Sequence, residues 1–185
     1  IIAGYGSDAI AGYTIAIRLI IFFLMPAWGL SNAAATLVGQ NLGAILIERA
    51  ELSVCISANY NGIFMGIVSL LFITAAPFFV GLMSNQPVVI ETGARALRII
   101  SFGYLFYGVG MVMMNAFNGA GDSRTPTIIN FFWFWIFQIP VAYFLSGSAN
   151  WGTSGVFWAI VITETCIAIT SMILFKKGRW KKVNI

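Results

Sequence analysis

The chain has 185 residues, of which 59% are hydrophobic and 9% are charged. Soluble domains carry about 25% charged residues, so this composition excludes an ordinary soluble domain and predicts an all-α membrane protein embedded in the lipid bilayer. The formal net charge of +4 comes from a basic stretch at 176–182, which indicates a membrane surface and not a nucleic-acid partner.

The chain has no histidine, and its two cysteines, Cys55 and Cys166, lie far apart inside apolar runs. This excludes His-based zinc and haem sites, Cys-x-x-Cys motifs and nucleophiles that depend on a histidine base. We therefore predict no metal site, no cofactor and no enzymatic reaction. The chain starts at Ile1 without an initiator methionine, which predicts a piece of a longer protein.

Long apolar runs, separated by charges and helix breakers, divide the sequence. A transmembrane helix needs about 20 apolar residues, so the charge-free runs at 52–90 and 125–163 are each too long for one helix. Pro77 and the segment 84–87 end the first of these runs, and the segment 146–152 divides the second. The predicted transmembrane helices are 10–38, 52–79, 90–117, 127–146 and 153–175.

The basic tail at 176–185 orients these helices. Lys and Arg favour the cytoplasmic side, which places the tail in the cytoplasm of an integral inner (plasma) membrane protein. Counting back, the loops at 41–51 and 118–126 are also cytoplasmic, and the loops at 84–87 and 147–152 are external with the N-terminus. Trp180 in the tail fits an interfacial anchor. Five helices with an external start predict further helices upstream.

Two charged residues fall inside predicted helices at the same depth. Arg18 and Glu164 each lie about 12 Å below the outer edge, at 1.5 Å per residue. An intramembrane charge costs about 2.5 to 3.5 kcal/mol on insertion scales, so it normally faces a partner or a wet cavity. The hypothesis is that Arg18 and Glu164 approach one another or share one polar cavity. A buried structural ion pair is the alternative.

The third predicted helix carries a stripe of Tyr107, Met111, Met114 and Asn118, whose spacings place them on one face. Such side chains can line a pocket for bulky hydrophobic cations, since an aromatic ring attracts a cation and methionine adapts to irregular ligands. Core packing is the alternative reading of the same stripe.

Amides and prolines also occur at membrane depth. Asn59, Asn61, Asn115 and Gln138 either form hydrogen bonds across helices or face water. Pro26 and Pro140 are expected to interrupt the first and fourth helices, either as hinges or as static bends.

The segment Gly119-Ala120-Gly121-Asp122 matches the GxGD string of intramembrane aspartyl proteases. That reaction needs two facing aspartates, and the chain offers only Asp8 and Asp122, which the predicted topology places on opposite sides of the membrane. The alternative is a helix stop followed by a polar cap, with Gly119, Gly121 and Asp122 in the turn and Pro126 near the start of the next helix.

Three strings resemble the carboxy-terminal lobe of multidrug and toxic compound extrusion (MATE) transporters, within a group that includes lipid-linked oligosaccharide flippases. The first is 9–13, AIAGY, leading to Arg18. The second runs from Pro26–Gly29 to 36–44, TLVGQNLGA, and contains Gly39, Gln40, Asn41 and Gly43. The third is 118–122, NGAGD, followed by Thr125, Pro126 and Asn130.

The resemblance implies a twelve-helix transporter of two six-helix lobes, of which these five helices form most of one. It implies an antiporter that exports drugs or other amphipathic and cationic organic compounds in exchange for Na+ or H+ by alternating access. Its partners are then the bilayer, a small-molecule substrate and the missing N-terminal lobe, and its only cofactor is the coupling ion. The structural and gating motifs are Pro26, Gly39, Gln40, Asn41, Gly43, Gly119, Gly121, Asp122, Pro126 and Pro140. The substrate-path candidates are Arg18, Tyr107, Met111, Met114, Asn115, Gln138 and Glu164.

One departure from the family concerns the coupling ion. Several members carry a membrane-embedded aspartate near the position of Tyr107, and this sequence has no acid between Glu91 and Asp122. The family's cation site therefore does not carry over, and coupling uses either acids in the missing lobe or Glu164, which is a candidate protonation site. The alternatives are a flippase, a GxGD protease and a purely structural membrane subunit. A flippase for a pyrophosphate-linked substrate should have several basic side chains in its cavity, whereas Arg18 is the only clear intramembrane base in this sequence.

Overall fold

The computed structural model describes residues 1–182, and every regular element in that range is a helix. The long helices are α1 (Ser7–Gly43), α2 (Ile47–Gly81), α3 (Pro87–Ser101), α4 (Tyr104–Gly119) and α7 (Gly152–Lys176). Between α4 and α7 one continuous helical segment changes between α and π geometry: α5 (Arg124–Asn130), η2 (Phe131–Gln138), α6 (Ile139–Tyr143) and η3 (Phe144–Ser148). Short 3-10 helices flank the bundle, η1 (Ile2–Tyr5) and η4 (Arg179–Lys182).

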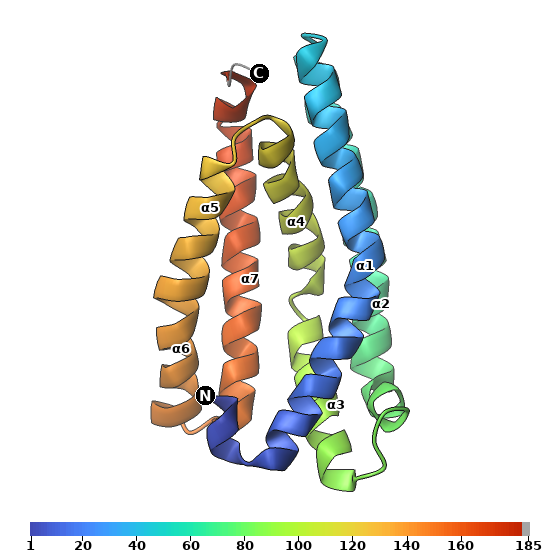
Figure 1. Cartoon of the computed structure of the whole chain (residues 1–185), viewed down its shortest axis with the longest axis vertical. Coiled ribbons are helices and arrows are strands. Elements are labelled where there is room, and N and C mark those ends of the chain that lie inside the picture. The colour runs from blue at the N-terminus through green and yellow to red at the C-terminus, as the bar shows by residue number, and fades with distance from the viewer. Residues whose placement is uncertain (183–185) are drawn as a thin grey trace.

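The helices form an elongated bundle whose long elements run along one axis (Figure 1). Within residues 1–182, four helical segments are long and apolar enough to span a membrane: α1, α2, Arg124–Ser148 and α7. The pair α3 and α4, bent by 56°, makes a fifth span if the two are counted together. The all-α membrane fold expected from the sequence is confirmed, with four to five spans. The spans extend beyond their predicted ranges at most ends; α1, for example, covers Ser7–Gly43 where 10–38 was predicted.

The bend between α3 and α4 was not predicted, because the sequence indicated one helix over 90–117. The helix opens at Phe102 and Gly103, and the carbonyl of Ser101 accepts a hydrogen bond of 2.7 Å from the Ser69 hydroxyl of α2. A side chain that inserts into the backbone ladder in this way is a recognised cause of kinks.

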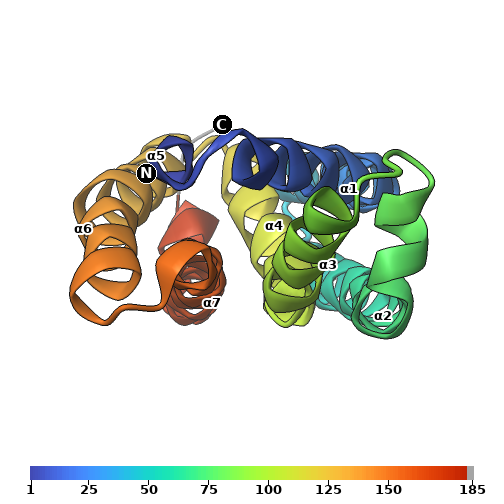
Figure 2. The same ribbon diagram turned by 90° about the horizontal axis from the view of Figure 1, so that it is seen from below.

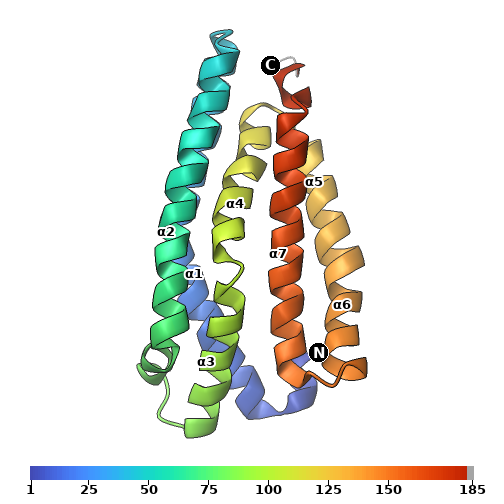
Figure 3. The same ribbon diagram turned by 180° about the vertical axis from the view of Figure 1, so that it is seen from behind.

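The bundle has two ends that differ in the loops they hold. The α1–α2 loop, the α4–α5 loop and the end of α7 lie together at what we call the tail end (Figures 1 and 3). The α2–α3 loop, the loop before α7 and the N-terminus lie at the opposite, N-terminal end. This grouping agrees with the two sets of loops expected from the sequence. Residues 183–185 of the predicted tail lie outside the described range.

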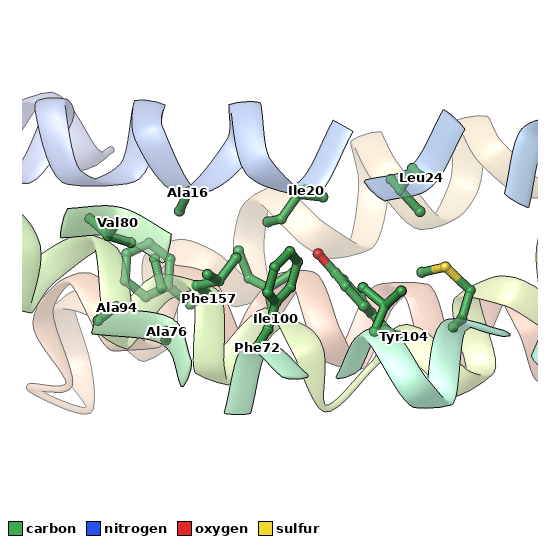
Figure 4. Close-up of a cluster of buried hydrophobic side chains, with 14 of the residues drawn as sticks. Ala16, Ile20, Leu24, Phe72, Ala76, Val80, Ala94, Ile100, Tyr104 and Phe157 are labelled. Atoms are coloured by element: carbon green, nitrogen blue, oxygen red, sulfur yellow. The ribbon is translucent and has the colours of Figure 1, made fainter. Parts of the chain in front are cut away.

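Seen along the bundle, α1 to α4 pack as one group, with α7 and the α5–α6 segment beside them (Figure 2). Small and apolar residues of α1 face inward, and Ile20 and Leu24 lie over Phe72 and Tyr104 (Figure 4). The rings of Phe23 and Phe72 meet edge to face at 4.9 Å between centroids. Aromatic packing therefore fills the core toward the N-terminal end.

The prolines act differently from the prediction. α1 is one helix that contains Pro26, and Pro140 lies at the start of α6 inside a continuous helical segment, so neither interrupts its span. The residue with non-helical backbone angles is Ala75, two positions before Pro77. Pro77 has no N–H for the carbonyl of Ile73, which instead accepts a hydrogen bond of 3.2 Å from Arg98 Nε. The kink of α2 thus coincides with a freed carbonyl that a side chain of α3 satisfies.

Trp180 is fully buried, so its predicted role as an interfacial anchor is wrong. Its ring stacks on Phe175 at 4.7 Å, and its Nε1 donates to the Phe175 carbonyl at 3.0 Å. The adjacent Lys181 Nζ forms an ion pair of 2.5 Å with Glu51 of α2. The glycine at Gly178, with φ of 70°, lets the chain turn back after α7 so that Trp180 returns to the core.

Candidate functional site

A cavity of about 170 Å³ lies between α4, α7 and the segment that begins with α5. We call it the Glu164 cavity. Its lining residues are Tyr107, Gly110, Met111, Met114, Asn130, Phe134, Glu164 and Ile167. The structure therefore brings together four of the residues that sequence reasoning selected, three from the α4 stripe and Glu164 from α7.

Glycines set the spacing of the helices around this cavity. A Cβ on Gly110 would lie 2.9 Å from the Cβ of Ala168, so α4 and α7 approach closely beside the cavity. On the other face of α4, a Cβ on Gly108 would lie 3.0 Å from the Asn61 carbonyl oxygen of α2. The amide of Asn61 also donates to the Gly108 carbonyl at 2.8 Å. These contacts hold α4 in register, which keeps Tyr107 level with Glu164.

Glu164 is half-buried and has no base beside it. Within residues 1–182 the ion pairs join Arg95 to Glu91 and Lys181 to Glu51, and neither involves Glu164. The neighbouring polar groups are the Tyr107 hydroxyl and the Asn130 amide, which are neutral. A carboxylate with only neutral oxygen donors around it can hold a proton or a small cation, because nothing in the cavity already neutralises it.

Arg18 does not share this cavity. It is exposed on α1, whose buried positions Ala16 and Ile20 face the core, and it lines none of the Glu164 cavity. The hypothesis that Arg18 and Glu164 pair, or share one polar cavity, therefore finds no contact in this structure. Equal depth along two helices did not reveal that they point to different faces.

Of the other predicted amides, Asn59 is exposed on α2, and Asn115 and Gln138 lie away from the Glu164 cavity. Asn115 donates from Nδ2 to the Ser31 hydroxyl of α1 at 2.7 Å, which is the cross-helix alternative. Gln138 lines a second cavity, of about 420 Å³, near the N-terminal end together with Tyr13, Ala142 and Val156.

The second and third family-like strings meet at the tail end. A Cβ on Gly119 would lie 2.8 Å from the Cα of Ala35, and a Cβ on Gly39 would lie 3.1 Å from the Gly119 carbonyl oxygen. The backbones of α1 and α4 therefore touch where the two strings cross. Of the other predicted motif residues, Asn41 donates to the Leu37 carbonyl at 2.8 Å within α1, and Gly43 has open space around it.

The turn after α4 is a helix stop followed by a cap, as one reading of the sequence predicted. Gly121 has φ of 79°, and the Asp122 N–H donates to the Phe117 carbonyl at 2.9 Å. The Asp122 carboxylate accepts hydrogen bonds from the Thr125 N–H at 3.1 Å and from its hydroxyl at 2.6 Å. We call Gly39, Gly119, Gly121 and Asp122 the tail-end knot.

Sequence reasoning did not select Asn130 and Phe134 as site residues, although both line the Glu164 cavity. Their spacing of four places them on one helix face, which was the available signal. Asn130 also belongs to the third family-like string and lies within the predicted helix 127–146.

Comparison with known proteins gives consistent matches. Residues 1–144 match the family model described as MatE. The chain is 28% identical over 185 residues to a probable multidrug resistance protein NorM of Pseudomonas aeruginosa, and this alignment covers 97% of this chain and 37% of that protein. It is 27% identical over 173 residues to the multidrug export protein MepA of Staphylococcus aureus, which covers 94% of this chain and 38% of that protein.

Among solved structures, the fold matches an inward-facing multidrug resistance MATE family transporter of the MOP superfamily. The TM-score is 0.84 at 21% identity, and the match covers 96% of this chain and 43% of that one. The chain thus spans less than half the length of the proteins it matches, and its fold is that of one lobe.

Proposed function

This chain belongs to the MatE family, and from that premise we propose that it is one lobe of an exporter of drugs and other amphipathic or cationic organic compounds, driven by exchange for Na+ or H+. The observation that carries the proposal is the Glu164 cavity, where an acid without a basic partner faces an aromatic ring, two methionines and an amide at membrane depth.

The size of the cavity favours the coupling ion over the substrate. Pockets for drug-sized molecules measure about 300 to 1,000 Å³, whereas this one measures about 170 Å³. We assign Glu164 as the group that exchanges the ion, with Tyr107 and Asn130 as neutral oxygen donors beside it. A proton needs only the carboxyl group, and Na+ would use the additional oxygens.

The second cavity is large enough for a substrate. It measures about 420 Å³, and the ring of Tyr13 and the amide of Gln138 give it the mixed lining that such pockets have. We assign substrate contact to this cavity and to the exposed Arg18 of α1, with Met111 and Met114 on the path between α4 and the α5–α6 segment.

We further propose that the tail end is cytoplasmic and that a second lobe faces this one across an alternating-access pathway. Charge distribution supports this orientation, since the positive-inside rule places Lys and Arg in the cytoplasm. The bases at the tail end are Arg49, Arg124, Lys176, Lys177, Arg179 and Lys181.

The chemistry of the cavities also separates this proposal from its alternatives. A flippase for a pyrophosphate-linked lipid needs several bases in its cavity, and the Glu164 cavity and the cavity at Gln138 have no Lys or Arg in their linings. A GxGD protease needs a second aspartate beside Asp122. Asp8 lies in the first turn of α1, at the opposite end of the bundle from the Asp122 turn (Figure 1).

A dye-efflux experiment tests the proposal. The full-length protein that contains this chain is expressed in cells without their own exporters and loaded with a cationic dye such as ethidium. Efflux is compared with an empty vector in Na+ buffer and in Na+-free buffer at two pH values. We expect efflux above the vector that depends on one of the two gradients. Membrane-inserted protein without efflux under either gradient would contradict the proposal.

A further inference from the structure

A charged ladder runs along the exposed face of α3. Glu91, Arg95, Arg98 and Phe102 follow each other at spacings of four, three and four, and all four side chains are exposed. Residues at such spacings share one helix face. Viewed from behind, α3 lies between α2 and α7 (Figure 3). Another face of α3 packs on α1, where a Cβ on Gly12 would lie 2.8 Å from the Gly93 nitrogen.

The ladder borders a cavity of about 340 Å³ beside the kink of α2. The cavity is lined by Pro77, Ile90, Glu91, Ala94, Arg95, Arg98 and Ile99. It holds two guanidinium groups and one carboxylate, so it offers a basic part to an anionic group and an acidic part to a cationic group.

Both guanidinium groups are held in place and still have free donors. Arg95 Nη2 contacts Glu91 Oε1 at 2.7 Å, and Arg98 Nε donates to the Ile73 carbonyl at 3.2 Å. Guanidinium carries five N–H donors, so most donors of each group remain for a ligand. Because Pro77 has no N–H for the Ile73 carbonyl, this contact holds Arg98 against α2 where it lines the cavity.

The ladder lies where a membrane changes from headgroups to hydrocarbon. α1 has 37 residues and is therefore about 55 Å long, which exceeds a hydrocarbon core of about 30 Å by roughly 12 Å at each end. Arg95 and Arg98 lie about 12 and 16 Å from the start of α3 by the same rise per residue. By these lengths the backbone of Arg95 and Arg98 lies at the boundary between headgroups and hydrocarbon. Their long side chains can extend outward from there to the phosphate level, with Glu91 on the water side. On the hydrocarbon side, Phe102 stacks on Trp158 at 5.9 Å.

We propose that this ladder binds one aminophospholipid of the phosphatidylethanolamine class from the leaflet at the N-terminal end of the bundle. From water inward, such a lipid presents an ammonium group, a phosphate and acyl chains. The protein presents a carboxylate (Glu91), two guanidinium groups (Arg95 and Arg98) and an aromatic pair (Phe102 and Trp158) in the same order. A planar guanidinium group can donate two hydrogen bonds to phosphate oxygens. The lipid ammonium would pair with the Glu91 carboxylate in place of Arg95.

Native mass spectrometry of the full-length protein tests this site by lipid competition. The purified protein is given equal amounts of phosphatidylethanolamine, phosphatidylcholine and phosphatidylglycerol with the same acyl chains. We expect the wild-type protein to retain phosphatidylethanolamine about tenfold over the other two, the factor for one charge-assisted hydrogen bond. Choline has no N–H to donate, and the glycerol headgroup has no ammonium.

Two variants separate the parts of the site. Glu91→Gln should abolish the preference for phosphatidylethanolamine over phosphatidylglycerol, and Arg95→Gln should weaken retention of all three lipids. The matched control is Arg49→Gln, which removes an exposed base at the opposite end of the bundle and should change nothing. Unchanged thermal unfolding midpoints would show that the variants fold. Arg98 is not substituted, because its contact with the Ile73 carbonyl also supports the packing of α3 on α2.

Three outcomes would overturn the inference. Glu91→Gln and Arg95→Gln could both keep the wild-type lipid preference. The control Arg49→Gln could reduce retention as much as Arg95→Gln, which would indicate only general attraction of lipids to basic residues. Excess inorganic phosphate could displace the lipid fully, which would make the cavity a site for free phosphate.

Discussion

The helix α4 passes through two regions that are built in opposite ways. Its end at Gly119 belongs to the tail-end knot, where backbones touch and Asp122 has its hydrogen bonds satisfied by Thr125. Its middle borders the Glu164 cavity, where half-buried polar groups face open space. The second and third family-like strings therefore serve packing between helices. The side chains suited to transport line the Glu164 cavity, belong to no glycine-rich motif, and are brought together by that packing.

The largest expected effect at the tail end is that of Trp180→Ala. The ring is fully buried on Phe175, so its removal should lower the free energy of unfolding by about 3 kcal/mol, as for other buried aromatic residues. Thermal unfolding in detergent measures this as a lower midpoint. Trp151, which is 53% exposed, is the matched control. Equal shifts for Trp180→Ala and Trp151→Ala would restore the interfacial-anchor reading.

Gly119→Ala should have the next largest effect. Its Cβ would meet the backbone of Ala35, which cannot move like a flexible side chain, and overpacking of this kind costs about 1 to 3 kcal/mol. Gly66→Ala is the control, because its Cβ would have only an ordinary contact at 3.9 Å with Leu105. If Gly119→Ala has the wild-type unfolding midpoint, then Gly119 is not needed for the close packing of α1 against α4.

Asp122→Ala should cost about 1 kcal/mol, the usual value of a lost helix cap. The variant leaves the Thr125 N–H and hydroxyl without the carboxylate that accepts from them. Asp8→Ala, in the first turn of α1 with no capping hydrogen bond, serves for comparison. If Asp122→Ala loses transport without any loss of stability, Asp122 takes part in transport itself. The tail-end knot would then not differ in this respect from the Glu164 cavity.

The smallest effect on stability is expected for Arg18→Gln. This side chain is exposed, and no ion pair in residues 1–182 includes it, so the unfolding midpoint should stay within error of the wild type. A drop comparable to that of Gly119→Ala, reversed by a charge-swapped Arg18→Glu and Glu164→Arg double variant, would show that the two residues pair after all.

Much of the fold could be predicted because each apolar run is long enough to span a bilayer. The stripe of Tyr107, Met111 and Met114 could be found by helical spacing alone. The bend after Ser101 could not, since it depends on the Ser69 hydroxyl of another helix. The burial of Trp180 could not be predicted either, because its stacking partner Phe175 becomes adjacent only after the chain turns at Gly178.

The prolines and the pair of intramembrane charges show the same limit. Pro26 and Pro77 look alike in sequence, and only the contact of Arg98 with Ile73 marks where the α2 backbone departs from helical angles. Depth along a helix was predictable for Arg18 and Glu164, but the direction of each side chain depends on how the helices are rotated against each other.

The most direct test of the account measures gradient-driven transport by Glu164→Gln in proteoliposomes made with the full-length protein. An inward Na+ or proton gradient is imposed, and substrate movement is compared with that of wild type and of Glu48→Gln, an exposed acid at the tail end. We predict that Glu164→Gln loses the response to the gradient while its unfolding midpoint is unchanged, and that Glu48→Gln keeps the response. Wild-type gradient dependence in Glu164→Gln would contradict the assignment of this cavity to the coupling ion.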